Sequence, residues 1–507
     1  KNLLDSFSYI VKPQNVRKEL SGLPPHILQT LKQQDGNYKV SLDKSVYTSI
    51  MENCSNRRLR ERLYKSNECI ENGNTELIVK ILALRQEKAK LLVNGSFAKL
   101  ALKDNIINQP QQVINLLSST FNNAYIKAKQ DYDLLVKYAK YKFNIQKLEP
   151  WDIDFVANAL YKDKIGFNET EIQKYFTVDS VTSGSFKLLE KLYNIKIRPE
   201  KSAATPHSDI ECFSISNKQG KKIAYFYLDL FIRDKKVKNS LSVPADYKEK
   251  DCLPSMVIYC NFKKSNTNTN NSTASTHLTH SQVKEFLHEL GGHGMQHLLT
   301  SVNGHMINGM ENTEWDIIEF NPKFMEKFCY DYEIMKQFSC QTNSSSKKYI
   351  PQDLFNSIIK SKEFLSAFIG KDAILQRLAL AMVDINLNHS SQTFTVDNIH
   401  DEARKIYQQY QLIPISDKSL FLNNFIHAFA GTGYESIFYS YILADIVGAQ
   451  LHKKFADSGD LENTELMQKY HNQFLSKGAT INANQALTSF LGEGINSKAF
   501  LEFYGLG

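Results

Sequence analysis

Long stretches with helical periodicity are the feature that most constrains the fold of this chain. Within residues 74–92 and 111–143, apolar side chains recur at intervals of three and four residues, which places them on one face of an α-helix. The second stretch suits either a pair of helices or one long helix. Helical periodicity continues to about residue 200 and returns near residue 280 until the end of the chain. We therefore predict a mainly α-helical fold.

A region of different character lies between these helical parts. Residues 210–231 contain two runs rich in β-branched and aromatic residues around the turn-like segment 217–220, and residues 255–262 form a third run. We expect these runs to form a small β-sheet at about residues 210–262. The polar, low-complexity segment 263–276 that follows is predicted to be a mobile surface insertion.

Length and charge exclude several classes of protein. With 507 residues, the chain is longer than one hydrophobic core usually supports, so we expect at least two subdomains. The net charge of +7 is small for this length and is spread along the sequence, which argues against a nucleic-acid or membrane surface. No stretch of about eighteen apolar, uncharged residues is present, so we predict no membrane-spanning helix.

The cysteines indicate the redox environment. They number seven, are widely scattered and form no C-x-x-C pair, which favours free thiols in a reducing intracellular compartment. The sequence begins at Lys1 with neither an initiator methionine nor an apolar leader, so we expect any targeting segment to have been removed.

The segment "FLHELGGHGMQHLL", residues 286–299, carries a candidate metal site. Two histidines and a glutamate often follow the pattern H-E-x-x-H, but here one extra residue separates His288 from His293. On a regular helix, residues five apart point about 140° away from each other, whereas residues four apart differ by about 40°. A π-bulge absorbs the extra residue, and Gly291-Gly292 suits such a distortion. We therefore predict a bulged helix with His288 and His293 as ligands of one metal ion.

A second histidine pair offers an alternative. His293 and His297 have the regular four-residue spacing, but no glutamate stands beside either of them. Metal-assisted hydrolysis needs an acid or base next to the metal-activated water, and Glu289 is placed for this role. We assign His297 a secondary role. A helix that carries three histidines without binding metal is the alternative that the motif alone leaves open.

A third metal ligand is expected from residues 310–328, because a catalytic zinc usually has three protein ligands and one open position. We predict a helix here that stops near Pro322, with Glu319 as the third ligand. Asp316, three residues earlier on the same predicted face, is expected to orient a ligand histidine. The remaining acidic residues, which we expect to face solvent, are Glu311 and Glu314.

An aromatic segment, residues 425–443, is the last candidate. Gly431 and Gly433 form a flexible loop, and three tyrosines follow it. Phenol and imidazole groups can donate hydrogen bonds to an oxyanion, which favours a catalytic role. Aromatic residues at this density are more often part of a hydrophobic core, so both interpretations stay open. The tyrosines are Tyr434, Tyr439 and Tyr441.

The ordered set of motifs resembles the thimet oligopeptidase family of zinc metallopeptidases, which includes neurolysin, oligopeptidase A and mitochondrial intermediate peptidase. The resemblance covers nearly the whole chain. It is carried by "ELSGLPPHIL" (19–28), "LRQEKAKLL" (84–92), "LEPWDI" (148–153), "AYFYLDLFIRD" (224–234), "VIYCNF" (257–262), "LTHSQVKEFLHE" (278–289), "TEWDIIEFNPKFMEKF" (313–328), "GYESIFYSYI" (433–442) and "LSKGATINANQALTSFLGEGINSKAFLEFYGL" (475–506).

The resemblance implies a two-lobed, mainly α-helical metallopeptidase with a deep central channel and a small sheet beside the zinc site. It implies a helical lobe in residues 1–150, lacking the first part of the family's helical region, and a catalytic lobe in residues 151–507. One Zn²⁺ per chain, short unstructured peptide substrates and a monomer are expected. The expected location is intracellular, in the cytoplasm or the mitochondrial matrix.

Residue by residue, His288 and His293 resemble the family's zinc histidines, Glu319 the third ligand and Glu289 the general base. Tyr441 is similar to the tyrosine that stabilises the oxyanion. Residues similar to the family's substrate-contacting loop are His427, which we also place in the catalytic set, and Gly431, Gly433, Tyr434 and Tyr439.

The sequence departs from the family at three places. One residue is added before the second zinc histidine, a form similar to the H-E-x-x-G-H signature of dipeptidyl peptidase III. The loop between His427 and Tyr434 is longer by about two residues, and Phe438 replaces a frequent tyrosine. The alternatives are therefore a mitochondrial intermediate processing peptidase, a dipeptidyl peptidase, or a catalytically impaired peptide-binding homologue.

Overall fold

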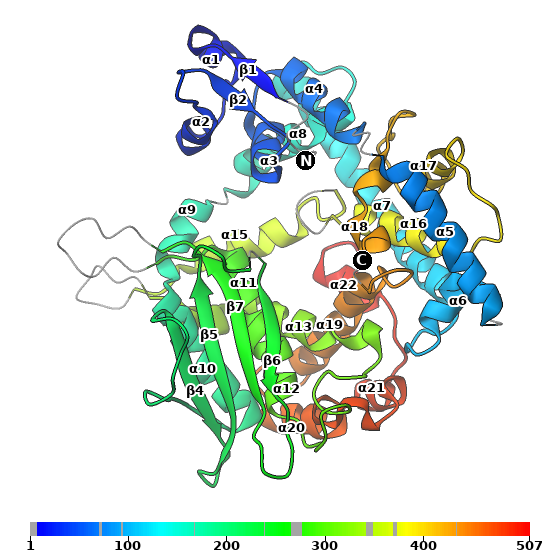
Figure 1. The fold of residues 1–507 in the computed structure, drawn as a ribbon. Helices are drawn as coiled ribbons and strands as arrows, with labels where there is room; N and C mark the ends of the chain where they lie inside the picture. The colour runs from blue at the N-terminus through cyan, green and yellow to red at the C-terminus, as the bar shows by residue number, and fades with distance from the viewer. Residues whose placement is uncertain are drawn as a thin grey trace.

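The computed structural model describes residues 8–69, 73–92, 95–166, 168–237, 239–264, 276–340, 348–368, 373–431 and 433–507 (Figure 1). Helices dominate it, and the prediction of a mainly α-helical fold with a small sheet is confirmed. Most of the predicted surface insertion, residues 263–276, lies outside the described residues. No helix in the described ranges is both long enough and apolar enough to cross a membrane.

The N-terminal elements form a small unit with its own hydrophobic cluster, drawn in blue at the top of Figure 1. A two-stranded antiparallel sheet, which we did not predict, packs here with four helices. Val11, Val40, Ile50 and Leu63 are almost fully buried in this cluster. The elements are β1 (Tyr9–Val11), α1 (Val16–Glu19), α2 (Pro25–Leu31), β2 (Tyr38–Val40), α3 (Lys44–Asn53) and α4 (Arg57–Glu68).

Both periodic stretches fold as helices. Residues 74–92 correspond to α5 (Asn74–Leu91), and residues 111–143 form one long helix, α7 (Pro110–Phe143), instead of a pair. The largest hydrophobic cluster includes residues from both sides of residue 150, such as Leu117 and Leu188. The lobe boundary at residue 150 and the central channel stay predictions. Neighbouring helices are α6 (Phe97–Leu102), α8 (Ile153–Ile165), α9 (Glu169–Ile172) and α10 (Val178–Tyr193).

The predicted sheet has five strands in the order β3-β4-β5-β7-β6, in which only β5 and β7 pair in parallel. The three predicted runs are confirmed as β4 (Ile210–Ser216), β5 (Lys222–Phe231) and β7 (Ser255–Phe262). Two strands were missed. β3 (Lys196–Pro199) is short, and β6 (Leu241–Asp246) contains Pro244, which is tolerated because β6 lies at the sheet edge.

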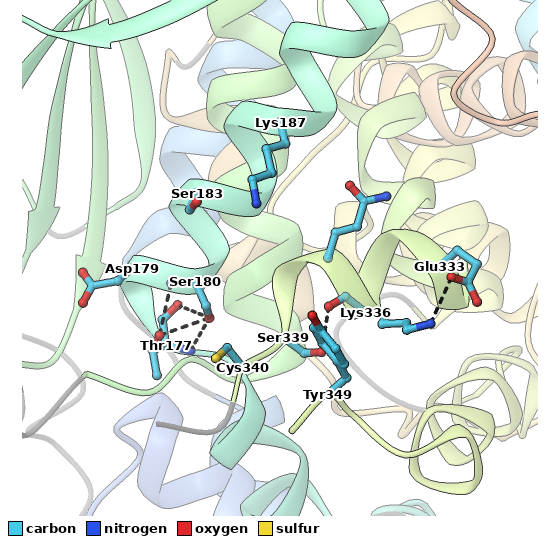
Figure 2. Close-up of a pocket in the computed structure, with 11 residues that line it drawn as sticks. Thr177, Asp179, Ser180, Ser183, Lys187, Glu333, Lys336, Ser339, Cys340 and Tyr349 are labelled. Atoms are coloured by element: carbon cyan, nitrogen blue, oxygen red, sulfur yellow. Dashed lines mark hydrogen bonds and ion pairs between the residues drawn. The ribbon is translucent and has the colours of Figure 1, made fainter. Parts of the chain in front are cut away.

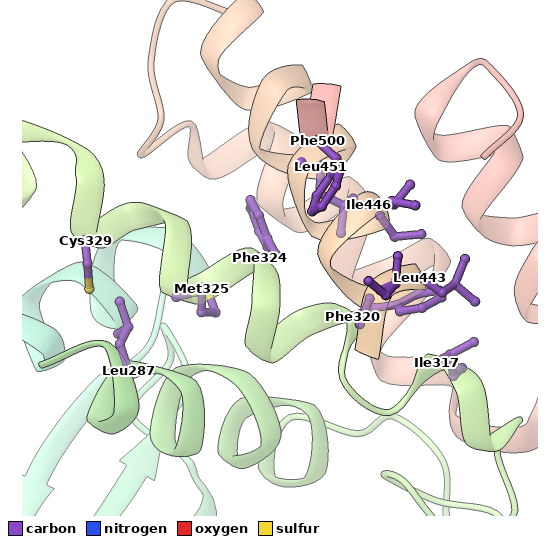
Figure 3. Packing of buried hydrophobic residues seen from close by; sticks show 14 of the residues in the cluster. Leu287, Ile317, Phe320, Phe324, Met325, Cys329, Leu443, Ile446, Leu451 and Phe500 are labelled. Carbon is purple, nitrogen blue, oxygen red and sulfur yellow. The ribbon is translucent and has the colours of Figure 1, made fainter. Parts of the chain in front are cut away.

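Three helical segments pack in sequence behind this sheet. The bulged helix around residue 290 contacts β6 and β7 on one side and α13 (Phe320–Lys327) on the other, and α13 in turn contacts α19 (Ser440–Asp457). Figure 3 shows Leu287, Met325, Phe324 and Leu443 in this shared core. A Cβ at Gly448 would lie 2.9 Å from the backbone nitrogen of Phe324, so glycine allows α13 and α19 to approach closely.

The remaining helices surround these layers. Those in the second half of the chain are α14 (Tyr332–Phe338), α15 (Gln352–Glu363), α16 (Ile374–His389), α17 (Ile399–Gln409), α18 (Ile426–Phe429), α20 (Thr464–Gln473), α21 (Ala483–Leu491) and α22 (Lys498–Phe503).

Candidate active site

The histidine-bearing helix is bulged as its sequence predicts. It begins as α11 (His280–Leu287), where Thr279 and Gln282 cap each other's backbone N–H groups. Residues His288–Gly294 then form a π-helix, and α12 (Met295–Leu298) returns to α-helical geometry. The π-turn brings the rings of His288 and His293 to a centroid distance of 5.1 Å at an interplanar angle of 80°. The predicted π-bulge is therefore confirmed.

The carboxylate of Glu319 lies close to both histidine rings. Its Oε2 lies 3.4 Å from His288 Nε2, and its Oε1 lies 3.8 Å from His293 Nε2. Ligand atoms of the three residues all lie within 4.8 Å of one another, and among the described residues no other group of His, Cys, Asp and Glu side chains meets this condition.

The helix that carries Glu319 differs from the prediction. We expected it to stop near Pro322, but α13 begins at Phe320, so Glu319 is its N-cap residue. Pro322 is the third residue of α13, where its missing N–H costs little because the first N–H groups of a helix have no intrahelical partner. Glu311 and Glu314, which we expected to face solvent, are half-buried: Tyr247 Oη donates to Glu311 at 2.7 Å, and the Ala483 N–H donates to Glu314 at 3.3 Å.

This donor set fits zinc. Zinc–ligand bonds of about 2.0–2.2 Å in a tetrahedron place neighbouring ligand atoms about 3.3–3.6 Å apart. The separations from Glu319 to His288 and His293, 3.4 and 3.8 Å, lie close to this range. Two imidazole nitrogens and one carboxylate also match the ligand types of a catalytic zinc with one open position.

Glu326, which we did not predict, holds the His288 ring. His288 Nδ1 lies 2.8 Å from Glu326 Oε1, and Lys323 Nζ lies 2.8 Å from the same oxygen. Burial alone would lower the pKa of His288, but the hydrogen bond to Glu326 and the charge of Glu319 raise it. Burial lowers the pKa of His293 to about 4, so this imidazole is neutral, as a metal ligand must be.

Asp316 does not take the role predicted for it. Its carboxylate accepts hydrogen bonds from the backbone N–H groups of Ile106 and Ile107, at 3.1 and 3.2 Å, and from Tyr439 Oη at 2.8 Å. Residues 315–317 form a separate 3₁₀ turn, so the three-residue spacing does not place Asp316 on one helical face with Glu319. The orienting carboxylate is Glu326 instead. It lies seven residues after Glu319, which the two-turn period of a helix could have indicated.

The structure also corrects the prediction that Tyr439 contacts substrate. Its side chain is 1% exposed, and its hydroxyl donates to the buried Asp316, whose pKa is raised by burial to about 6. This pair connects the start of α19 to the loop before α7. Tyr439 therefore has a structural contact where we expected a substrate contact.

Two other tyrosines of the aromatic segment, Tyr434 and Tyr441, lie near Glu319. The rings of Tyr434 and Tyr441 stack at 4.9 Å, and the exposed His427 ring lies 5.9 Å from that of Tyr441. Burial and the charge of Glu319 raise the pKa of both tyrosines, so both hydroxyls are protonated donors. Gly431 and Gly433 are exposed and have φ angles of 68° and 86°, a left-handed conformation that suits glycine.

Arg377 fixes the position of Tyr441. Its Nη2 donates to the Tyr441 carbonyl at 2.7 Å, and its Nη1 lies 2.8 Å from Asp445 Oδ2. Asp445 also pairs at 3.1 Å with Lys327, which follows Glu326 on α13. The aromatic segment is thereby tied to the helix that begins at Glu319.

Glu289 lies buried next to His288, where its carboxylate feels the charges of His288 and Glu319. It is 5% exposed, and the Ser242 hydroxyl lies 2.6 Å from Glu289 Oε2. Burial raises the pKa of Glu289, which makes the carboxylate a stronger base. Ser242 belongs to the missed strand β6, so no pattern in the sequence pointed to it. His297 points elsewhere, since its Nε2 lies 2.9 Å from the Asp246 carbonyl oxygen at the end of β6.

A cavity of about 600 Å³ lies elsewhere, between the start of α10 and the end of α14 (Figure 2). Thr177, Lys187, Lys336 and Cys340 are among the residues that line it. None of the predicted site residues belongs to its lining, so this cavity adds nothing to the metal cluster.

The helical fold and the His-His-Glu cluster beside a buried glutamate are together those of a metallopeptidase. A sequence model of Peptidase family M3 matches residues 50–506, nearly the whole chain. The chain therefore belongs to peptidase family M3, and the resemblance to the thimet oligopeptidase family is confirmed. It is a metalloendopeptidase, an enzyme that cleaves peptides.

Individual relatives agree with this family. Oligopeptidase A of Haemophilus influenzae is 27% identical, over 100% of this chain and 75% of the relative. Saccharolysin of Saccharomyces cerevisiae is 24% identical, over 100% and 72%. Mitochondrial intermediate peptidase of Vanderwaltozyma polyspora is 21% identical, over 90% and 62%.

Solved structures support the fold. The structure of PZ peptidase A with an inhibitor matches with a TM-score of 0.55 and 14% identity, over 92% of this chain and 70% of that one. A putative oligoendopeptidase F matches with a TM-score of 0.53 and 12% identity, over 94% and 72%.

Proposed function

We propose that this protein is a zinc-dependent endopeptidase that cleaves short, unstructured peptides by means of an activated water molecule. The convergence of His288, His293 and Glu319 next to Glu289 is the observation that carries this proposal. Membership of peptidase family M3 supports it. The added residue in the histidine motif does not weaken it, because the π-turn returns both rings to one place.

His288, His293 and Glu319 are the groups that would hold one Zn²⁺ per chain. Bound zinc supplies Lewis-acid chemistry, which polarises a peptide carbonyl and makes water a stronger acid. Glu326 accepts a hydrogen bond from the Nδ1–H group of His288 and so leaves Nε2 free to face the ion.

Glu289 acts as the proton carrier. It takes a proton from the attacking water and returns it to the leaving amine of the peptide. The Ser242 hydrogen bond fixes one carboxylate oxygen and leaves the other available.

The tyrosine segment contributes hydrogen bonds. The Tyr441 hydroxyl donates to the carbonyl oxygen as that atom gains negative charge. His427 and Tyr434 contact the peptide, and Gly431 and Gly433 let the loop adapt to it. The enzyme acts as a monomer inside the cell, in the cytoplasm or, as one relative's name suggests, in mitochondria.

Glu289→Gln tests the function directly. The variant should bind zinc like the wild type but lose hydrolysis of a quenched fluorescent peptide, because the amide cannot accept the water proton. Glu285→Gln, one turn earlier on α11, is the matched control and should remain active. Metal analysis should show one zinc per chain before chelation and loss of that zinc after it. Purified protein without zinc, or an active Glu289→Gln variant, would contradict the proposal.

The position of the cut distinguishes related activities. Mass spectrometry of a peptide of about ten residues should show internal cleavage. Release of N-terminal dipeptides alone would indicate a dipeptidyl peptidase. Cleavage restricted to presequence remnants would indicate a mitochondrial processing role, and binding without cleavage would indicate an impaired homologue.

A further inference from the structure

Asn321 contacts the bulge of the histidine-bearing helix from the opposite helix. Its Nδ2 lies 2.9 Å from the Gly292 carbonyl oxygen and 3.2 Å from the Gly291 carbonyl oxygen. Both partners are carbonyls, which only accept hydrogen bonds, so the amide nitrogen must face them. The side chain is 1% exposed, and these contacts are therefore shielded from water.

The two carbonyls belong to the part of the helix that departs from α geometry. At the end of the π-segment, the Met295 N–H is shared between the carbonyls of Leu290 and Gly292. A helix that changes from π to α geometry weakens its own ladder locally, and side chains commonly supply the missing hydrogen bonds. Asn321 supplies two donors at this point.

Packing reinforces the same contact. A Cβ at Gly292 would lie 2.4 Å from the Cα of Pro322, so the backbone of the bulge rests directly on the residue after Asn321. Asn321 is also only two residues from Glu319. One short segment thus carries both the carboxylate of the metal cluster and the groups that touch the bulge between the histidines.

We propose that Asn321 is a positioning residue for the metal site. It ties the Glu319 segment to the bulge, and this holds His293 and Glu319 at the separation that metal binding needs. The inference rests on the proposed function, because it assigns the metal to this cluster. It goes further by naming the residue that makes the lengthened histidine motif usable.

Two variants of the full chain separate hydrogen bonding from packing. Asn321→Ala removes the amide, and Asn321→Asp keeps its shape but loses both donors. Both should weaken zinc binding, measured by chelator competition, by about 10- to 100-fold, the usual cost of losing a residue that orients metal ligands. In zinc-free protein, both should speed amide hydrogen exchange in residues 290–295, and kcat should fall more than KM changes.

Asn386→Ala is the matched control. This asparagine lies on α16 and also donates to a helix carbonyl, that of Met382, at 2.8 Å. The control should keep wild-type zinc affinity and wild-type exchange in the bulge. The visible spectrum of the cobalt-substituted protein should change in the Asn321 variants and stay unchanged in the control.

Several outcomes would overturn the inference. Wild-type zinc affinity in the Asn321 variants would do so, and so would reduced stability in urea without changed affinity or exchange, because that pattern means a purely structural role. If Asn321→Ala does not fold, the isosteric Asn321→Asp variant decides. Wild-type protein that binds no zinc would instead refute the proposed function and the metal part of this inference, while exchange in zinc-free protein still tests whether Asn321 holds the bulge.

Discussion

Glu289 is a buried carboxylate and Glu326 a partly buried one, and their surroundings shift their pKa values in opposite directions. Burial raises the pKa of Glu289. For Glu326, burial acts in the same direction, but the charge of Lys323 and the hydrogen bond with His288 hold its pKa well below the usual range. Neighbouring groups whose pKa values are pushed apart take different roles. Glu289 is suited to exchange a proton, and Glu326 is suited to remain an anion that orients His288.

Tyr441→Phe should lower kcat by about 100-fold with little change in KM, which is the usual effect of losing one hydrogen bond to a developing oxyanion. The ring remains, so its stacking with Tyr434 is kept. Steady-state kinetics on a quenched peptide provides the measurement. A wild-type kcat in this variant would remove Tyr441 from the mechanism.

Tyr439→Phe is a useful comparison with Tyr441→Phe, because it removes a nearby tyrosine hydroxyl that contacts Asp316. It removes the hydroxyl that donates to the buried Asp316, which should lower the free energy of unfolding by about 1–3 kcal/mol. Since Tyr439 contacts Asp316 and not the metal cluster, kcat should stay near the wild-type value. Urea unfolding and kinetics on the same preparations separate the two effects.

Among the elements, those with a strong period or a local distortion could be predicted from sequence. The spacing of His288 and His293, with two glycines between them, required a π-turn, and the structure has one. Strand β6 was not predicted because Pro244 interrupts its strand pattern, and Ser242, which lies on β6, was therefore not predicted either. The orienting carboxylate was assigned to Asp316 instead of Glu326 because we predicted one helix that carries both Asp316 and Glu319 and stops near Pro322. The chain instead forms a 3₁₀ turn and starts a new helix after Glu319.

The fit between the π-helix and α13 predicts different tolerance at its two adjacent glycines. A Cβ at Gly292 would lie 2.4 Å from the backbone of Pro322, which cannot move without displacing α13. At Gly291, the nearest atoms are the flexible ends of Leu287 and Met325, both 3.1 Å away. Gly292→Ala should therefore weaken zinc binding strongly and destabilise the protein by about 1–3 kcal/mol, as overpacking does.

Gly291→Ala is the control for this element. Its cost of crowding is offset by the better helix propensity of alanine, worth about 1 kcal/mol, so stability should stay near that of the wild type. Thermal unfolding and zinc titration of both variants give the comparison. Equal behaviour of the two alanine variants would mean that Pro322 does not constrain the bulge.

At the scale of the whole molecule, the fold also buries ionisable groups of opposite kinds that are not part of the metal cluster. His280 is the first residue of α11, its Nε2 lies 3.0 Å from the Cys329 carbonyl oxygen, and burial lowers its pKa to about 3. Asp384 on α16 accepts hydrogen bonds from the backbone N–H groups of Ser436 and Phe438, and burial raises its pKa to about 7. Folding therefore disfavours the charged form of both side chains. Because one is a base and the other an acid, their contributions to stability change with pH in opposite directions.

His280→Gln and Asp384→Asn should tilt the pH dependence of stability in opposite directions. Between pH 5 and 6, His280 binds a proton in the unfolded chain but not in the folded one. The free energy of unfolding therefore falls as the pH is lowered, by up to about 1.4 kcal/mol per pH unit. Folded Asp384 holds a proton in this range, whereas its unfolded carboxylate, with a pKa near 3.9, does not, so its contribution falls as the pH is raised. In urea unfolding of zinc-free protein, stability should rise with pH less steeply than in wild type for His280→Gln and more steeply for Asp384→Asn. Equal slopes in all three proteins would mean that neither group keeps its shifted pKa in the folded state.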